Sequence, residues 1–214
     1  MEITANHSPV VQALSLSATV GETLSVDVIN GVNAPTDADG DGLAVTAVSG
    51  PLLGGGSAAT NGGTGFTYSA TVTGTNQFSY TVSDPYGGTA TNTVTVVVHP
   101  TYESWAVANG IAGAPFGGIS NGISNGIKYA MGASPNTYTL MPTLVQSGAN
   151  FTLTYPKGAE AASDPKIVYA FEVSTDLNQW TQVAPTTEDG TAVSLTLSGG
   201  GTRRFARLKI IRLP

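Results

Sequence analysis

Three aspartates stand at alternate positions in the first half of the chain, Asp37, Asp39 and Asp41, and Gly40 and Gly42 interrupt and follow them. Calcium is a hard cation that takes about six to eight oxygen ligands, and alternate residues of a turning loop can point their carboxylates toward one centre. The glycines permit the bend that this convergence needs. The spacing therefore predicts a Ca2+ site, and a solvated acidic turn is the alternative.

This loop is not an EF-hand. Counted from Asp37, the position that would need a bidentate glutamate is Val48, and strands rather than helices are expected on both sides. Further ligands must come from elsewhere in the chain. Asp84, which lies in a turn before Pro85, and backbone carbonyls are the candidates. The predicted ligand set is therefore Asp37, Asp39, Asp41 and Asp84.

The charge distribution excludes several classes of partner. The first 127 residues contain no Lys or Arg but eight acidic residues, whereas the remainder holds all eight basic residues and six acidic ones. Without a basic stripe, the acidic half cannot neutralise phosphates or attract anionic lipid. No apolar run approaches the roughly 20 residues of a membrane span. We expect neither nucleic-acid binding nor membrane insertion.

Candidate catalytic groups are few. The chain has no cysteine, which excludes disulfides, thiolate metal ligands and cysteine nucleophiles. Two overlapping Gly-x-Ser-x-Gly patterns, 118–122 and 122–126, match a hydrolase nucleophile elbow, but such an elbow needs a later histidine, and both His7 and His99 precede Ser120. The glutamates show no pairing typical of glycoside hydrolysis. We predict a protein that is not an enzyme.

Two features of the second half allow more than one interpretation. Trp180 is either a structural anchor in a small β core, which we favour, or a glycan contact. The last segment, 203–213, is basic. It is best explained as a solvated final strand with basic edge residues, and an acidic partner is the alternative.

Period-two alternation defines the elements that must position these residues. It runs from about Val10 to Val98 and predicts about seven strands, as in an immunoglobulin-like sandwich. Pro100 ends the last of them. Short helices are expected at 102–109, ended by Gly110, and at 124–131, capped by Ser124.

Alternation resumes from about residue 138. The expected fold is all-β, with two β-sandwiches at 1–99 and 138–214 and a helical connector at 100–137.

The first domain contains four segments in a characteristic order: Asp37-Ala-Asp-Gly-Asp-Gly-Leu-Ala-Val-Thr-Ala-Val-Ser, Gly65-Phe-Thr-Tyr, Gly74-Thr-Asn-Gln-Phe-Ser-Tyr-Thr-Val-Ser-Asp-Pro-Tyr-Gly-Gly and Thr93-Val-Thr-Val-Val-Val. Over about residues 6–98 it resembles the cadherin-like, bacterial Ig-like tandem repeats of large exported proteins. The resemblance implies a calcium-stiffened spacer or adhesion module. The segment Asn6-His-Ser-Pro stands where such repeats carry a linker, so we expect a further repeat upstream.

The second half contains Ile123-Ser-Asn-Gly-Ile-Lys-Tyr-Ala-Met-Gly-Ala-Ser-Pro, Ser174-Thr-Asp-Leu-Asn-Gln-Trp and Phe205-Ala-Arg-Leu. Over about residues 105–214 it resembles a C-terminal region of large exported proteins from Verrucomicrobia-like bacteria. That family's loop aspartates fall on Gly117, Ile119 and Asn121 here, and its helix glutamate falls on Lys128. The departure removes the charges that would hold calcium, so no second site is expected.

Together these features predict a non-catalytic, calcium-stiffened spacer or adhesion module at the C-terminal end of a large secreted or cell-surface bacterial protein. Its expected partners are other domains of that protein and a glycan or cell-surface partner. The alternative is a carbohydrate-binding accessory region of a secreted polysaccharide-active enzyme. An exposed, coplanar set of rings including Trp180, Tyr155 or Tyr169 would favour that alternative.

Overall fold

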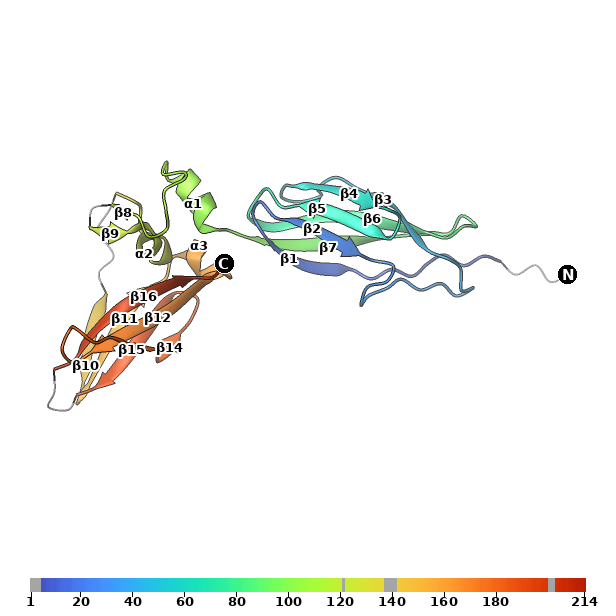
Figure 1. Ribbon diagram of the computed structural model, residues 1–214. Coiled ribbons are helices and arrows are strands. Elements are labelled where there is room, and N and C mark those ends of the chain that lie inside the picture. The colour runs from blue at the N-terminus through green and yellow to red at the C-terminus, as the bar shows by residue number, and fades with distance from the viewer. Residues whose placement is uncertain (1–4, 121, 137–141, 200–202) are drawn as a thin grey trace. The chain divides into compact units, whose positions relative to one another are not determined.

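A computed structural model describes residues 5–120, 122–136, 142–199 and 203–214 (Figure 1). The chain divides into two compact units, Met1–His99 and Pro100–Pro214. Each unit is built mainly of strands, which confirms the predicted all-β, two-domain fold. Among the described residues, no helix has both the length and the apolar character needed to cross a membrane.

The first unit pairs a four-stranded sheet with a three-stranded sheet. The larger sheet has the order β1 (Leu14–Thr19), β7 (Thr89–His99), β6 (Gly74–Ser83) and β3 (Ala44–Val48), and the smaller has the order β2 (Thr23–Asp27), β5 (Gly65–Ser69) and β4 (Ser57–Asn61). β1 runs parallel to β7, and the other pairs are antiparallel. The seven strands agree with the number that the alternation predicts.

Alternate residues of β5 and β6 fill the core of this unit. Phe66 and Phe78 meet edge to face with ring centroids 5.1 Å apart, and Tyr68 stacks on Phe78 at 5.2 Å. Each buried tyrosine hydroxyl finds a backbone acceptor: Tyr68 donates to Gly55 O at 2.7 Å, and Tyr80 donates to Gln12 O. The rings therefore contribute apolar area and offset geometry without leaving a buried hydroxyl unpaired.

The register of one strand pair positions the acidic loop. β3 pairs with β6 so that Ala44 lies opposite Ser83. The loop that contains Asp37 and Asp41 ends at the start of β3, and Asp84 directly follows the end of β6. Because antiparallel partners lie side by side, this register brings residues far apart in the sequence to the same edge of the sheet.

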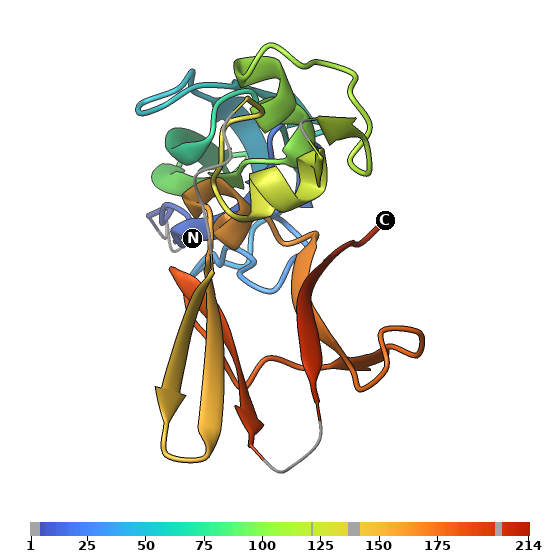
Figure 2. The ribbon, with the colours of Figure 1, turned by 90° about the vertical axis from the view of Figure 1, so that its left-hand side faces the viewer.

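The second unit also packs two sheets. One has the order β10 (Thr143–Ser147), β11 (Asn150–Pro156), β15 (Ala192–Ser198) and β14 (Thr187–Glu188), and the other has the order β13 (Thr181–Val183), β12 (Ile167–Ser174) and β16 (Phe205–Arg212). A two-residue pairing joins β8 (Ile119–Ser120) to β9 (Ile123–Ser124). The helices of this unit lie at one end of its strands (Figure 2).

Both predicted helices form, and their ends lie within one residue of those predicted. Helix α1 (Tyr102–Ala108) is capped by Thr101 and followed by Gly110 at φ 72°, where the left-handed backbone favours glycine. Helix α2 (Asn125–Ala130) is capped by Ser124, whose Oγ accepts from Ile127 N at 3.3 Å. The serine of the second Gly-x-Ser-x-Gly pattern is therefore a helix cap.

The helical segment contributes to the core of the second unit. Tyr102, Trp105 and Tyr129 are buried and meet at ring-centroid distances of 5.5–5.7 Å. Tyr129 donates to Asp164 Oδ2 at 3.0 Å, and Tyr169 of β12 donates to Ala130 O at 2.6 Å. The segment that the sequence sets apart as a connector thus shares one core with the strands, and the predicted boundary at 137/138 lies outside the described residues.

A third helix, α3 (Ala159–Ser163), follows Gly158. The sequence does not predict this helix, because the residue at its cap position, Gly158, has no side chain that could cap a helix start. Its Ala161 is buried in the same core. Tertiary packing, more than a local signal, accounts for this short element.

Candidate metal centre

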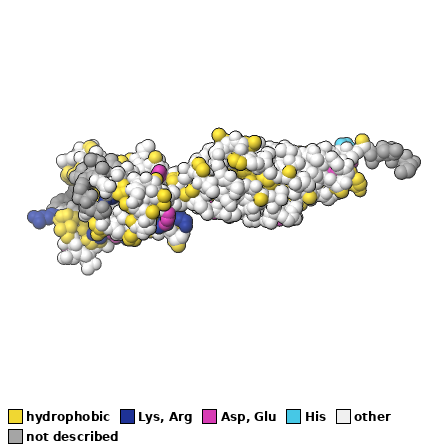
Figure 3. All heavy atoms as spheres, turned by 90° about the horizontal axis from the view of Figure 1, so that it is seen from above, with side chains coloured by type: hydrophobic (Ala, Val, Ile, Leu, Met, Phe, Trp, Pro, Cys, Tyr) yellow, Lys and Arg dark blue, Asp and Glu magenta, His cyan; other side chains and the backbone are white. Residues whose placement is uncertain are grey.

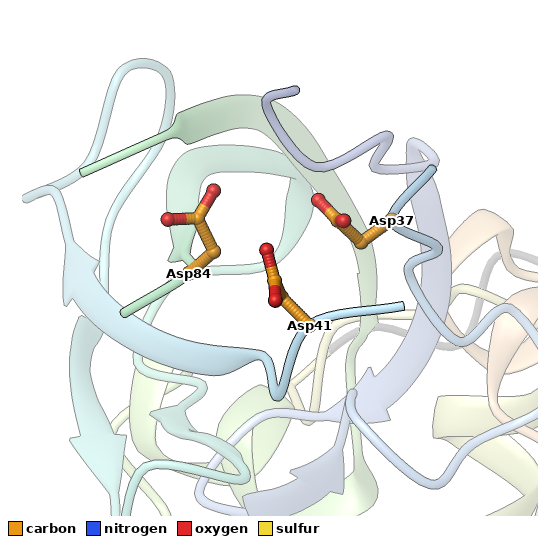
Figure 4. Close-up of side chains that lie close together, drawn as sticks. All are labelled: Asp37, Asp41 and Asp84. Atoms are coloured by element: carbon orange, nitrogen blue, oxygen red, sulfur yellow. The ribbon is translucent and has the colours of Figure 1, made fainter. Parts of the chain in front are cut away.

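Three carboxylates converge at one edge of the first unit. Asp37, Asp41 and Asp84 each offer an oxygen, and these oxygens lie within 4.8 Å of one another (Figure 4). Two come from the loop before β3 and one from the turn after β6. The β3–β6 register thus brings together three of the four residues that the sequence proposes as ligands.

Two of these carboxylates keep unsatisfied oxygens. Asp37 Oδ2 and Asp41 Oδ2 are shielded from solvent, and neither has a hydrogen-bond partner. Burying a charged oxygen without a partner is costly, and native structures normally pair such atoms. A cation between the carboxylates would satisfy both oxygens, and an all-oxygen donor set suits a hard divalent ion such as Ca2+. The residues present therefore fit the predicted metal.

The electrostatics of Asp41 reflect this crowding. Burial raises the pKa of Asp41 above its ordinary value, and the negative charges of Asp37, Asp39 and Asp84 raise it further. Like charges at short range disfavour ionisation. A bound divalent cation would reverse the sign of the local field and keep Asp41 ionised.

Asp84 is held in place by its own turn. Its Oδ1 accepts from Tyr86 N at 2.7 Å and from Gly88 N at 3.0 Å, and Asn6 Nδ2 donates to Oδ2 at 3.1 Å. Burial raises the pKa of Asp84, but these hydrogen bonds outweigh burial and leave the pKa below its usual value. A Cβ at Gly88 would lie 2.1 Å from Asp84 Oδ2, so only glycine allows this approach.

Asp39 turns away from the other three. Its carboxylate accepts from His7 N at 2.7 Å and lies 3.0 Å from His7 Nδ1. These hydrogen bonds from the backbone and ring of His7 lower the pKa of Asp39. Asp39 N donates to Asp37 Oδ1 at 2.8 Å, and Gly40 takes a φ of 78°, so the loop folds as a turn that separates the middle aspartate from its neighbours.

The ligand set predicted from the sequence does not contain Asn6 or His7. The structure pairs His7 with Asp39, which lies 32 positions further along the chain. No local pattern indicates such a pairing. The only signal is that the acidic half contains no Lys or Arg, which leaves histidine as its sole ionisable side chain able to carry positive charge.

Trp180 lies in the second unit, beside β13. Its Nε1 donates to Leu177 O at 3.1 Å, and the Arg207 guanidinium lies over the ring at 4.0 Å from the centroid. One ring face is therefore occupied. Tyr169 is only 3% exposed, and Tyr155 packs against Phe171 with centroids 6.0 Å apart. These three rings do not form the exposed, coplanar set that the carbohydrate-binding alternative calls for.

Residues 6–97 match the sequence model of the bacterial Ig domain. This agrees with the Ig-like part of the expected resemblance and with the seven-stranded sandwich of the first unit. Bacterial Ig domains are typically non-catalytic and occur in extracellular or surface proteins. A comparison with curated proteins found no match.

Several solved structures are similar over part of their length. A nucleoside hydrolase-related protein from Saccharophagus degradans is 23% identical, with a TM-score of 0.35, over 44% of this chain and 26% of that one. The human Desmocollin-1 ectodomain is 12% identical, with a TM-score of 0.32, over 99% and 37%. The endo-fucoidan hydrolase MfFcnA9 is 12% identical, with a TM-score of 0.39, over 98% and 34%. The chain thus spans about a quarter to a third of these proteins.

Proposed function

We propose that the chain is a non-catalytic part of a larger bacterial extracellular or surface protein, and that its first unit is an Ig-like spacer stiffened by one Ca2+ ion. The observation that carries this proposal is the pair of buried, unpartnered oxygens on Asp37 and Asp41, facing the carboxylate of Asp84. Three carboxylates held together with no cationic side chain repel one another. A divalent cation supplies the missing charge.

The chain's own residues explain how binding would stiffen the unit. Asp37 and Asp41 belong to the loop before β3, and Asp84 belongs to the turn that its bonds to Tyr86 and Gly88 hold closed. Asn6 is tied to Asp84 and His7 to Asp39. A cation held by the three aspartates would therefore join the loop, the turn and the entering chain, so that they move as one piece.

The match to the bacterial Ig domain supports the non-catalytic role and the extracellular or surface location. Within such a protein, the partners of this chain would be neighbouring domains, and adhesion would be a property of the assembled protein. Hydrogen exchange with and without Ca2+ would test the stiffening directly. Slower exchange should be confined to residues 5–8, 37–42 and 84–88.

Calorimetric titration of the metal-stripped chain with Ca2+ would test the site itself. We expect one ion per chain, with binding lost or strongly weakened in Asp41→Asn. Glu160→Gln is the matched control, because it removes one exposed negative charge in the other unit. Equal binding by the wild type and Asp41→Asn, or no binding by the wild type, would disprove the calcium proposal.

A further inference from the structure

The second unit contains an apolar cavity of about 400 Å³ between its sheets. Its wall is formed by aliphatic and aromatic side chains from three neighbouring strands: Leu144, Phe151, Leu153, Leu195 and Leu197. Leu144 is 66% exposed and Phe151 is 39% exposed, so the cavity opens to solvent. The register places this opening at the Asn150–Ser198 end of the β11–β15 pair, whereas the helices lie near its Pro156–Ala192 end.

The cavity exists because one inward position is small. Ala206, Leu208 and Ile210 form the row of β16 that packs against the core, opposite Val173, Phe171 and Tyr169 of β12. At the helical end large side chains fill the space between the sheets. At the other end Ala206 leaves room, and it lines the cavity. The opening is therefore a consequence of side-chain size within a regular sandwich.

A basic residue stands at the edge of this apolar space. Arg204 continues the row of Ala206 and Leu208 by two residues and lines the cavity. The three basic residues of β16, which follows Arg204, all have acidic partners: Arg207 and Lys209 share Glu172, and Arg212 pairs with Glu103. Within the described ranges, no carboxylate lies within ion-pair distance of Arg204. Figure 3 shows Lys or Arg side chains close to hydrophobic ones on the surface of the second unit.

Arg204 also lines a second, more polar hollow of about 300 Å³. Its wall carries hydroxyl and amide groups from the end of β12, the start of β13 and the turn between them: Ser174, Thr175, Gln179 and Thr181. Leu197 and Arg204 are common to both hollows. The guanidinium thus stands between an apolar space and a set of neutral hydrogen-bonding groups.

We infer that this end of the second unit binds an aliphatic carboxylate. The hydrocarbon chain occupies the leucine-lined cavity, and the carboxylate pairs with Arg204 beside the polar hollow. Burial of the chain and of the exposed faces of Leu144 and Phe151 drives association. The planar guanidinium matches the two oxygens of a carboxylate and gives the site its preference for anions.

This inference does not depend on the calcium proposal, because the two sites lie in different units. It also predicts that two related classes of ligand do not bind. A cationic amphiphile is repelled by Arg204, and a short carboxylate such as acetate gains nothing from the apolar cavity. Only a molecule with both an aliphatic chain and an anionic group satisfies both parts of the site.

The test is calorimetric titration of the whole chain with dodecanoate below its micelle concentration. A chelator is present, so that calcium neither precipitates dodecanoate nor binds to the three aspartates of the first unit. We expect saturable binding of dodecanoate and none of dodecyltrimethylammonium or acetate. Arg204→Gln should weaken dodecanoate binding roughly tenfold, the size expected for loss of a charge-assisted hydrogen bond. Arg203→Gln is the matched control, because Arg203 lines neither hollow, and it should bind as the wild type does.

A second variant tests the apolar half of the site. Ala206→Leu fills the cavity from within, so it should abolish dodecanoate binding while the second unit still unfolds cooperatively. The inference is overturned if dodecanoate does not bind, if dodecyltrimethylammonium binds equally well, or if Arg204→Gln leaves the affinity unchanged. Because Arg204 is exposed, its variant tests the inference even if Ala206→Leu does not fold.

Discussion

The two units differ in the charges that surround their carboxylates. Up to His99 the chain has seven acidic residues and no Lys or Arg, a net charge of -7, whereas from Pro100 seven acidic residues face eight basic ones, a net charge of +1. In the first unit Asp37, Asp41 and Asp84 meet one another. In the second unit Glu172 lies between Arg207 and Lys209, at 2.7 and 3.0 Å.

This difference shows that one fold class allows two solutions to the same electrostatic problem. The second unit pairs many of its charges internally, for example Lys157 with Glu188 at 2.7 Å and, across neighbouring strands, Arg207 with Glu172. The first unit has no Lys or Arg for such pairs, and its ion pair among the described residues is that of His7 with Asp39. The first unit should therefore respond to its ionic surroundings, and the second should be largely indifferent to divalent metal.

Removal of calcium should separate the units most clearly. With Ca2+ at a hundredfold excess over its dissociation constant, linkage adds about 2.7 kcal/mol to the stability of the unit that binds it. Differential scanning calorimetry with calcium and with chelator should move only the transition of the first unit. Equal shifts of both transitions, or no shift of either, would contradict the comparison.

Tyr129→Phe should affect only the second unit. The hydroxyl of Tyr129 donates to the buried Asp164, and its loss leaves a buried carboxylate with fewer partners, at a cost of about 1–2 kcal/mol. Chemical unfolding followed by the two tryptophans, both of which lie in this unit, measures the loss. An unchanged midpoint would show that the hydrogen bond contributes nothing net.

Asp41→Asn and Asp39→Asn should differ although the two residues are close in sequence. Asp41 keeps an unpartnered buried oxygen, whereas Asp39 is engaged by His7. We expect Asp41→Asn to lower calcium affinity at least about tenfold, because affinity follows the charge of the ligand set, and Asp39→Asn to lower it less. Asp41→Asn should also raise the melting temperature in chelator, since it removes like-charge repulsion. The reverse order of affinities would place Asp39 among the ligands.

The smallest expected effect is the acid response of the second unit. Hydrogen bonds from Lys209 and Arg207 lower the pKa of Glu172 below its ordinary value of 4.5. A carboxyl with a lowered folded-state pKa contributes stability that is present above the unfolded value and is lost as the pH falls through the folded value. The second transition should therefore be flat from neutral pH to about 4.5 and then decline.

Glu172→Gln is the variant that checks this origin. It should reduce the acid decline of the second transition and leave the first transition unchanged. If the decline is the same in the variant and the wild type, other carboxyls with lowered pKa values, such as Asp176 and Asp189, are responsible.

Much of the fold could be predicted because its signals are local. Period-two alternation follows from the pleat of a strand, so it marks Phe66 and Phe78 as core residues wherever the strands lie in the sheet. Helix ends are equally local, and Ser124 and Gly110 lie where the caps were expected. Helix α3 was missed because its start has no capping side chain.

The amino-acid sequence by itself determined that the first unit is acidic, that it has no internal cation beyond histidine, and that its strands form a sandwich. Only the tertiary structure decided which carboxylates meet. The pairing of Ala44 with Ser83 brings Asp41 to Asp84, while the turn around Gly40 directs Asp39 to His7. Likewise, the size of Ala206 matters only because packing places it opposite a wall of leucines. Composition and alternation are properties of neighbouring residues, whereas these contacts depend on strand register, which no short stretch of sequence specifies.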